Sequence, residues 1–341
     1  MEPPHESLNN NDLAGQIDEI SAIVSQEFQI ESTLVSKNEV KFWLKETNET
    51  KQPFLNLLRK LSAVGRMAVL RRDKNQLYIT VFPKPQTTKN NNFLPIALLL
   101  LTLVTLFLSG DLLFGNATSL TGGLCFTASM LATLGIHELG HKLWANRSGV
   151  KTTWPYFIPG PPPLGTFGAV IFQKTPAPNR DALFDVGASG PVMGFLASVM
   201  FTAIGFITNF GIVASNIRVV HIPLIFDAIV RLTSSQDSIV LNPFIFAGLI
   251  GLFITWINLI PASTLDGGHV ANAVLTKRAH QFLTFLSIVA VTLIGYWALG
   301  VFLVLTWMMQ PVVPLDNVSE LSAKRKLATL CLIAIFLLCV L

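Results

Sequence analysis

The hydrophobic pattern divides the chain near residue 90. Before that point apolar residues are interspersed with charges, whereas beyond it long apolar runs carry few charges. A run of about 20 apolar residues is long enough to cross the hydrocarbon core of a bilayer. Four runs are therefore expected to be membrane spans: 93–110, 119–144, 182–210 and 244–260.

Three later segments complete the predicted fold. Residues 282–309 are too long for one comfortable helix, so we expect a tight hairpin broken near Gly300. Residues 327–341 are short for a span, and the charges in 211–242 indicate an exterior loop with amphipathic pieces. The pattern predicts a polytopic α-helical membrane protein with about six to seven transmembrane helices and a re-entrant or hairpin segment.

The first 90 residues have the pattern of a small soluble domain. Helices are expected around 18–28 and from residue 54 to near Gly65, and strands at 39–45, 67–70 and 77–82. The division is thus a cytosolic α+β head at 1–90 and a transmembrane domain at 91–341. The head carries no His/Cys cluster and no glycine-rich loop, so we interpret it as a regulatory or docking domain.

Composition and charge support this division. Hydrophobic residues make up 51% of the chain and charged residues 13%, which is too apolar for an ordinary soluble protein of this length. The net charge of +4 is modest and basic residues form no stripe interleaved with aromatics, so no nucleic-acid partner is expected. We find no signal-peptide pattern at the N-terminus, and the three cysteines in apolar runs do not suggest disulfides.

The basic residues predict the topology. Clusters precede the first and third spans and follow the second and fourth, at Lys84, Lys89, Lys142, Arg147, Lys151, Lys174, Arg180, Lys277 and Arg278. If each span crosses once, all of them lie on one side, which the positive-inside rule identifies as the cytosol. The N-terminus and the opening of the candidate site are predicted to face that side. The basic run at 324–326 joins them only if 282–309 crosses twice, which supports the hairpin.

The clearest chemical motif is His137-Glu138-Leu139-Gly140-His141, near the end of the second span. Residues four apart share a helix face, so two imidazoles can bind one metal ion. This is the H-E-x-x-H pattern of zinc peptidases, in which zinc acidifies a water molecule and the glutamate accepts its proton. Ionisable residues inside a span usually indicate function. The alternative is a helix end at the interface with solvated side chains.

A hydrolytic zinc usually has three protein ligands and one open position. Apart from Glu138, the chain contains no glutamate between Glu49 and Glu320, and Glu320 lies in a late polar loop. Residue 147, where one zinc-peptidase class has a third histidine, is an arginine. The remaining candidates for the third ligand are an aspartate or a distant histidine.

Asp266 stands out among these candidates. It follows the fourth span, on the same side as the HELGH motif, where Pro261 and the pair Gly267-Gly268 would unwind a helix. Irregular backbone at membrane depth is tolerated where it is buried in protein or lines a cavity. In isolation this segment would be read as an ordinary Asp-Gly turn.

Together the two motifs resemble the site-2 protease family of intramembrane zinc metalloproteases, most closely its EGY-type branch. The resemblance covers roughly residues 93–311 and rests on H-E-x-x-H followed by N-x-x-P-x-x-x-L-D-G-G, which begins at Asn258. It implies one Zn²⁺ per chain, bound by His137, His141 and Asp266, with Glu138 as the catalytic base. It also suggests that Asn258 is a polar catalytic group near the scissile peptide.

The resemblance extends to residues 159–171, between the second and third spans. There, 165–171 is expected either to form a strand or hairpin that pairs with an unwound substrate helix, or to be a bare loop. The predicted function is hydrolysis of a peptide bond within or near a transmembrane helix of another protein, in the lipid bilayer. Alternatives are a zinc peptidase acting on soluble or unfolded chains, and a non-enzymatic metal transporter or chaperone. No oligomeric state is predicted.

Overall fold

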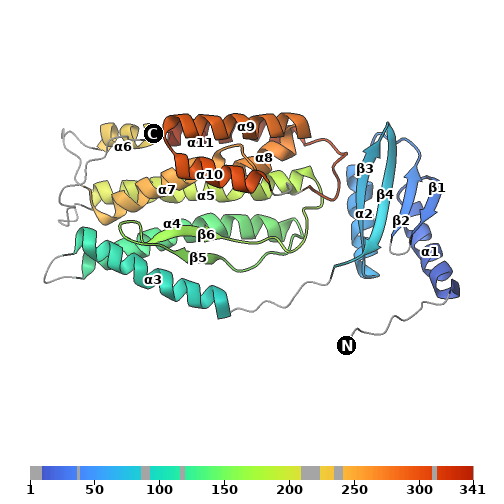
Figure 1. The fold of residues 1–341 in the computed structure, drawn as a ribbon, viewed down its shortest axis with the longest axis horizontal. Coiled ribbons are helices and arrows are strands. Elements are labelled where there is room, and N and C mark those ends of the chain that lie inside the picture. Colours follow the sequence, from blue (N-terminus) through green and yellow to red (C-terminus); the bar gives the residue numbers. More distant parts are fainter. Residues whose placement is uncertain are drawn as a thin grey trace. The chain divides into compact units, whose positions relative to one another are not determined.

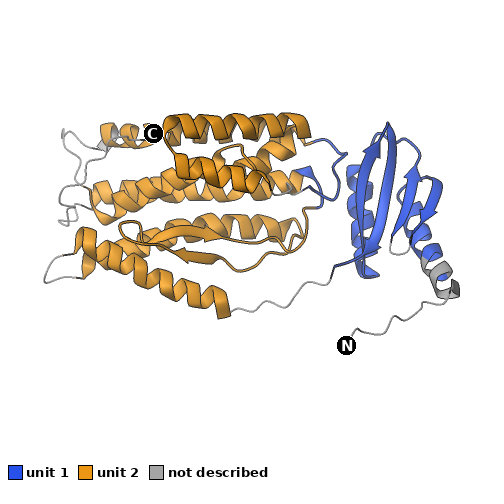
Figure 2. Cartoon of the chain, viewed as in Figure 1, with its two compact units in different colours: residues 1–88, 178–180, 313–320 blue, residues 89–177, 181–312, 321–341 orange. Residues whose placement is uncertain are grey.

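The computed structural model describes residues 10–36, 39–85, 93–115, 120–208, 223–233, 241–308 and 313–340 (Figure 1). The chain forms two compact units, coloured separately in Figure 2. The first unit combines residues 1–88 with two short segments from later in the chain, 178–180 and 313–320. The second unit comprises residues 89–177, 181–312 and 321–341.

The first unit is a four-stranded antiparallel sheet in the order β1-β2-β4-β3, packed against two helices. Its elements are α1 (Asn10–Ser25), β1 (Ile30–Val35), β2 (Val40–Leu44), α2 (Lys51–Ala63), β3 (Arg66–Asp73) and β4 (Gln76–Pro83). Alternate residues of the strands, such as Phe42 and Leu44, are buried with Phe54 of α2 in one core. Strand β1 was not anticipated, because its side chains are almost all exposed and lack the alternation of a half-buried strand.

Residues 313–320, which we call the clasp segment, are an integral part of the first unit. The backbone amide of Leu70 in β3 donates to the carbonyl of Leu315 at 2.9 Å, and the Leu315 side chain is buried in the core of this unit. The amide of Asp316 donates to the carbonyl of Pro178, also at 2.9 Å. The fully buried Asp316 carboxylate accepts two backbone amides of its own turn. The clasp segment is therefore hydrogen-bonded to β3, and residues 178–180 are in turn hydrogen-bonded to the clasp segment.

The second unit is a bundle of helices with one β-hairpin (Figure 1). Its elements are α3 (Phe93–Phe114), α4 (Thr121–Arg147), β5 (Tyr156–Pro159), β6 (Thr166–Val170), α5 (Arg180–Ile207), α6 (Leu224–Thr233), α7 (Pro243–Leu259), α8 (Asp266–Val274), α9 (Lys277–Ile294), α10 (Trp297–Trp307) and α11 (Ala323–Cys339). Helix α4 packs against α3 and α7. It also approaches α5 closely, where Gly140 lies against the Ser189 carbonyl. The central position of α4 puts its HELGH motif inside the bundle.

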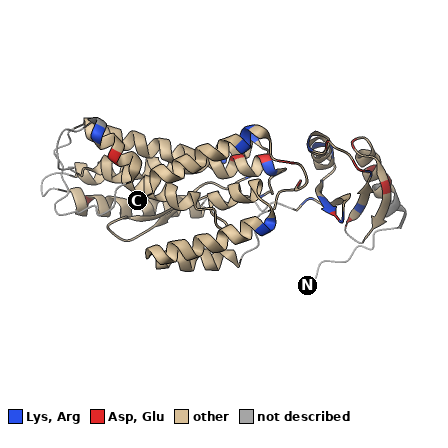
Figure 3. Cartoon of the chain, turned by 90° about the horizontal axis from the view of Figure 1, so that it is seen from above, with Lys and Arg blue, Asp and Glu red and all other residues tan. Residues whose placement is uncertain are grey.

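The surface of the second unit has the character of a membrane protein. Among the described helices, α3 and α5 are long and apolar enough to cross a bilayer, while α7 and α10 are shorter apolar helices. Large side chains such as Phe93, Leu112 and Leu293 are 72–81% exposed. Charged residues of this unit gather at the ends of the helices (Figure 3). An apolar exterior with charged ends fits a bilayer. Of the six to seven transmembrane helices expected, two of the described helices are long and apolar enough to span a membrane on their own.

The predicted hairpin in 282–309 is present as α9 and α10, but the break near Gly300 is wrong. The chain turns at Gly295, which ends α9 with a left-handed φ of 105°, a conformation that glycine adopts without steric cost. Gly300 lies inside α10, where an added Cβ would be 2.4 Å from Oγ1 of Thr292. It therefore permits close packing of α9 and α10. Of the expected loop 211–242, residues 211–222 and 234–240 lie outside the described residues.

Candidate metal centre

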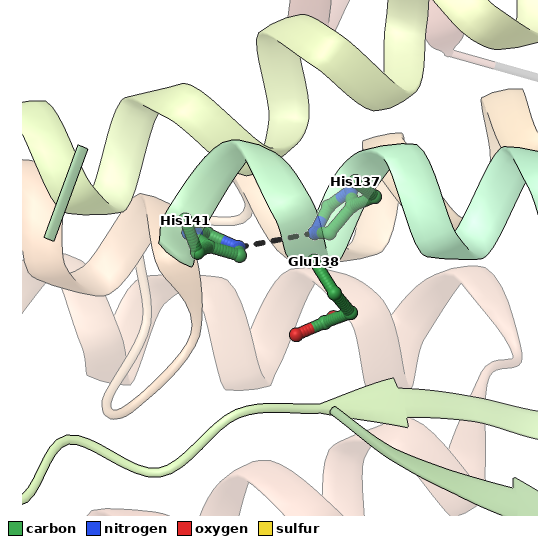
Figure 4. A group of neighbouring side chains, drawn as sticks. All are labelled: His137, Glu138 and His141. Carbon is green, nitrogen blue, oxygen red and sulfur yellow. Dashed lines mark hydrogen bonds between the residues drawn. The ribbon is translucent and has the colours of Figure 1, made fainter. Parts of the chain in front are cut away.

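Helix α4 presents His137, Glu138 and His141 in the interior of the second unit (Figure 4). The three residues are only 4–6% exposed. The histidines lie one helical turn apart, with their Nε2 atoms 3.2 Å from each other. This burial excludes the alternative of solvated side chains at a helix end.

The carboxylate of Asp266, the first residue of α8, completes this cluster. Its Oδ2 atom lies 3.3 Å from Nε2 of His137 and 3.2 Å from Nε2 of His141. The three atoms thus form a nearly equilateral triangle. In a tetrahedral zinc site with bonds of about 2.0 Å, ligand atoms lie about 3.3 Å apart. Two imidazoles and one carboxylate with this spacing fit one face of a zinc tetrahedron and leave the fourth corner open.

Glu138 is a second carboxylate close to the histidines, but it has a different environment. One of its oxygens and the two histidine nitrogens lie within 4.8 Å of one another. Its side chain is directed toward the β5–β6 hairpin (Figure 4), where the backbone amide of Ile171 donates a hydrogen bond to it. The geometry therefore distinguishes two carboxylates: that of Asp266 closes the donor triangle, and that of Glu138 lies beside it on the hairpin side.

Asp266 reaches the histidines because the chain breaks between α7 and α8. Ser263 in this break has a φ of 49°, in the left-handed region that is uncommon for residues other than glycine. An added Cβ on Gly267 would lie 2.3 Å from the Leu259 carbonyl oxygen, and one on Gly268 would lie 2.4 Å from that of Ser263. The expectation that the glycine pair would unwind a helix is wrong. Both glycines lie in the first turn of α8, where they allow its backbone to pack against the break.

Helix α5 packs against the two imidazoles. The carbonyl oxygen of Val186 lies 2.7 Å from Nδ1 of His141. A proton on Nδ1 makes this hydrogen bond and leaves the Nε2 lone pair for a metal. An added Cβ on Gly190 would lie 2.0 Å from Nε2 of His141, and one on Gly194 would lie 2.6 Å from Nδ1 of His137. Both glycines therefore leave room for the imidazoles. Their four-residue spacing, which matches that of the histidines, was the available signal in the sequence.

Asn258, which the sequence suggested, and His269 also lie at this cluster. The amide nitrogen of Asn258, near the end of α7, is 3.4 Å from Nε2 of His137. His269 in α8 is close enough to Asp266 to interact with it electrostatically.

The profile of Peptidase family M50 matches residues 125–302, which are 178 of the 341 residues and include the whole cluster. The protein described as probable zinc metalloprotease EGY2, chloroplastic, from Arabidopsis thaliana is 34% identical over 227 residues, covering 60% of this chain and 40% of that protein. The corresponding EGY1 of the same plant is 32% identical over 217 residues, covering 58% and 39%.

A more divergent relative is the protein described as probable zinc metalloprotease EGY3, chloroplastic, from Oryza sativa subsp. japonica. It is 26% identical over 245 residues, covering 61% of this chain and 41% of that protein. The chain therefore spans about two-fifths of the length of these curated relatives. No solved structure matches it.

Proposed function

The chain belongs to peptidase family M50, and from this premise we propose that it is an intramembrane zinc metalloprotease. Its substrate would be a membrane protein, cut at a peptide bond within or near a transmembrane helix. The observation that carries the proposal is the triangle of donor atoms from His137, His141 and Asp266, with sides of 3.2–3.3 Å, buried in an apolar helical unit.

The proposed roles follow from the positions of the side chains. His137, His141 and Asp266 would bind one Zn²⁺ per chain. When bound, zinc supplies a Lewis acid that acidifies water and polarises a carbonyl group. Glu138, on the hairpin side of the triangle, would accept the proton of the attacking water and deliver it to the leaving amine. Asn258 would use its amide to bind the polarised carbonyl oxygen of the substrate.

The β5–β6 hairpin is suited to bind the substrate in an extended form. A transmembrane helix keeps its amides in internal hydrogen bonds, so it has to unwind before hydrolysis. Strand β6 pairs with β5 on one side, and no other described strand pairs with it. It leads directly to Ile171, whose amide contacts Glu138. An unwound segment added along β6 would be guided toward the base and the metal.

We place the protein in a membrane as a multi-pass protein, with its N-terminus and the opening of the site on the cytosolic side. The support for this sidedness is the clustering of basic residues beside the ends of α4 and α5 that lead into residues 148–179. The head would then lie in the same aqueous compartment as that opening.

We propose that the head at residues 1–90 is a regulatory or docking domain. This proposal is supported by the clasp segment, because its Leu315 is buried in the head core and accepts the backbone amide of Leu70. The clasp segment leads into α11, and the other inserted segment leads into α5. Asp316→Ala should release the clasp segment, as measured by faster hydrogen exchange at Leu70, and should change the cleavage rate without removing zinc. An unchanged rate with the clasp segment released would contradict a regulatory head.

The catalytic proposal is tested with the purified full chain, zinc and a single-span substrate. The wild-type protein should cleave the substrate, and Glu138→Ala should lower the rate by about 10²- to 10⁴-fold while retaining one zinc per chain. A soluble unfolded chain offered in parallel distinguishes an intramembrane protease from a general zinc peptidase. Cleavage by the Glu138→Ala protein at the wild-type rate would refute the proposed mechanism.

A further inference from the structure

Helix α9 carries two buried polar residues that belong to neither sequence motif. His280 is 4% exposed and Thr284 is fully buried. They lie one helical turn apart and therefore share a face of the helix. An ionisable side chain buried in a largely apolar helix usually has a functional reason.

Thr284 contacts the break between α7 and α8. Its Oγ1 atom accepts a hydrogen bond of 3.2 Å from the backbone amide of Ser263. Ser263 is the residue in the break with a left-handed φ of 49°. Such a conformation persists only where surrounding contacts stabilise it. Thr284 provides one of these contacts and thereby holds the chain three residues before Asp266.

His280 contacts the segment that follows Asp266 in the chain. Its imidazole makes a hydrogen bond with the backbone of Gly268, two residues after Asp266. The Nε2 atom is buried and has no hydrogen-bond partner among the described residues, so Nδ1 makes this contact. The segment that carries Asp266 is thus tied to α9 on both sides.

Apolar contacts reinforce these two hydrogen bonds. Ile260 and Ala262 of the break are buried in one cluster with Val291 of α9 and Leu303 of α10. The α9–α10 hairpin therefore covers a segment that lacks the regular hydrogen bonds of a helix. Contacts from α9 therefore add to the few backbone hydrogen bonds that the break makes within itself.

We propose that His280 and Thr284 are positioning residues that hold Asp266 at the distance required for metal binding. The inference rests on the proposed assignment of Asp266 as a zinc ligand. A metal–ligand distance tolerates a displacement of only about 0.2 Å, so a small shift of the break weakens binding. Removing the partners that orient a ligand typically costs 10- to 100-fold in metal affinity or activity.

The test compares paired variants of the full chain in detergent. Thr284→Val has the same shape but no acceptor, whereas Thr284→Ser keeps the hydroxyl. His280→Leu removes the imidazole, whereas His280→Asn retains an amide N–H near the position of Nδ1. Thr292→Val is the matched control, because the hydroxyl of Thr292 donates to Ile288 of its own helix at 2.7 Å.

Zinc affinity is measured by competition with a chelator, and site geometry by the visible spectrum of the Co²⁺ form, which responds to ligand geometry. Thr284→Val and His280→Leu should lose about 10-fold or more in zinc affinity and change the Co²⁺ spectrum. Thr284→Ser, His280→Asn and Thr292→Val should resemble the wild type. Unchanged affinity and spectrum in both Thr284→Val and His280→Leu would overturn the proposal.

Melting temperatures with and without zinc separate positioning from a general structural role. If a variant lowers the melting temperature of the metal-free protein but retains the wild-type zinc-induced increase, the positioning role is wrong. Asp266→Asn tests the premise separately. If it binds zinc as tightly as the wild type, the ligand assignment fails. If it loses zinc while Thr284→Val and His280→Leu do not, only the inference about α9 fails.

Discussion

Replacing Gly190 with alanine tests the packing between α5 and the metal centre. The new Cβ would lie 2.0 Å from Nε2, 2.4 Å from Cε1 and 2.5 Å from Cδ2 of His141. These atoms belong to one rigid ring, so rotation of a flexible chain end cannot relieve the overlap. The ring cannot retreat freely either, because its Nδ1 atom is hydrogen-bonded to the Val186 carbonyl.

The size of the effect follows from these distances. Ordinary contact begins at 3.4 Å, so the ring or α5 has to move by about 1.4 Å, the difference between 3.4 and 2.0 Å. That is about seven times the 0.2 Å that a metal–ligand distance tolerates. A misplacement of about 1 Å costs about 100-fold in catalysis. Overpacking should also destabilise the fold by about 1–3 kcal/mol.

The assay combines zinc content per purified chain, cleavage of a single-span substrate and thermal denaturation. Gly135→Ala is the matched control, because Gly135 lies in α4 near the motif and an added Cβ there meets nothing within 4 Å. This control should keep zinc and activity, and the added methyl should stabilise α4 by about 0.5–1 kcal/mol. If Gly190→Ala bound zinc and cleaved like the wild type, His141 could not be packed against α5 in the way described.

Three further predictions concern the same unit. Chelation of zinc should lower the melting temperature, because the metal stabilises only the folded state, and it should abolish cleavage. Added zinc should restore both, and cleavage in excess chelator would contradict this prediction. Arg325→Lys should lower stability in thermal denaturation by about 1 kcal/mol, because the guanidinium binds both Asp181 and Asp185, and zinc affinity should not change. Asn258→Ala should keep zinc but lower the rate constant of cleavage by about 100-fold in a single-turnover assay; loss of zinc instead would identify a role in metal binding.

Local periodicity was sufficient for the features that lie within one element. His137 and His141 are four residues apart, and a helix places such residues on one face whatever surrounds it. In the same way, the apolar runs predicted α3, α4, α5 and α7 close to their observed bounds. The apolar patterns of 39–45, 67–70 and 77–82 likewise predicted β2, β3 and β4 of the head, but not β1.

Features that depend on distances between elements required the tertiary structure. Asp266 was a candidate from the sequence, but its separation from the histidines depends on how the break after α7 folds back. The break itself is held by Thr284 and His280 of α9, which no local pattern connects to it. The role of Gly190 is visible only once α5 lies against the imidazole of His141.

The clasp segment most clearly shows the difference between what local sequence patterns predict and what tertiary packing decides. Its residues 313–320 are distant in sequence from the head, yet Leu315 is buried in the head core and the Leu315 carbonyl accepts the amide of Leu70. Hydropathy reports the burial that one element needs, but it does not identify the partner that supplies it. By itself, the sequence determined the four long apolar helices, the α+β character of the head and the pair of histidines on one helix face, because each depends on neighbouring residues. The tertiary structure decided which distant backbone and side-chain groups meet them, because those contacts arise only from packing.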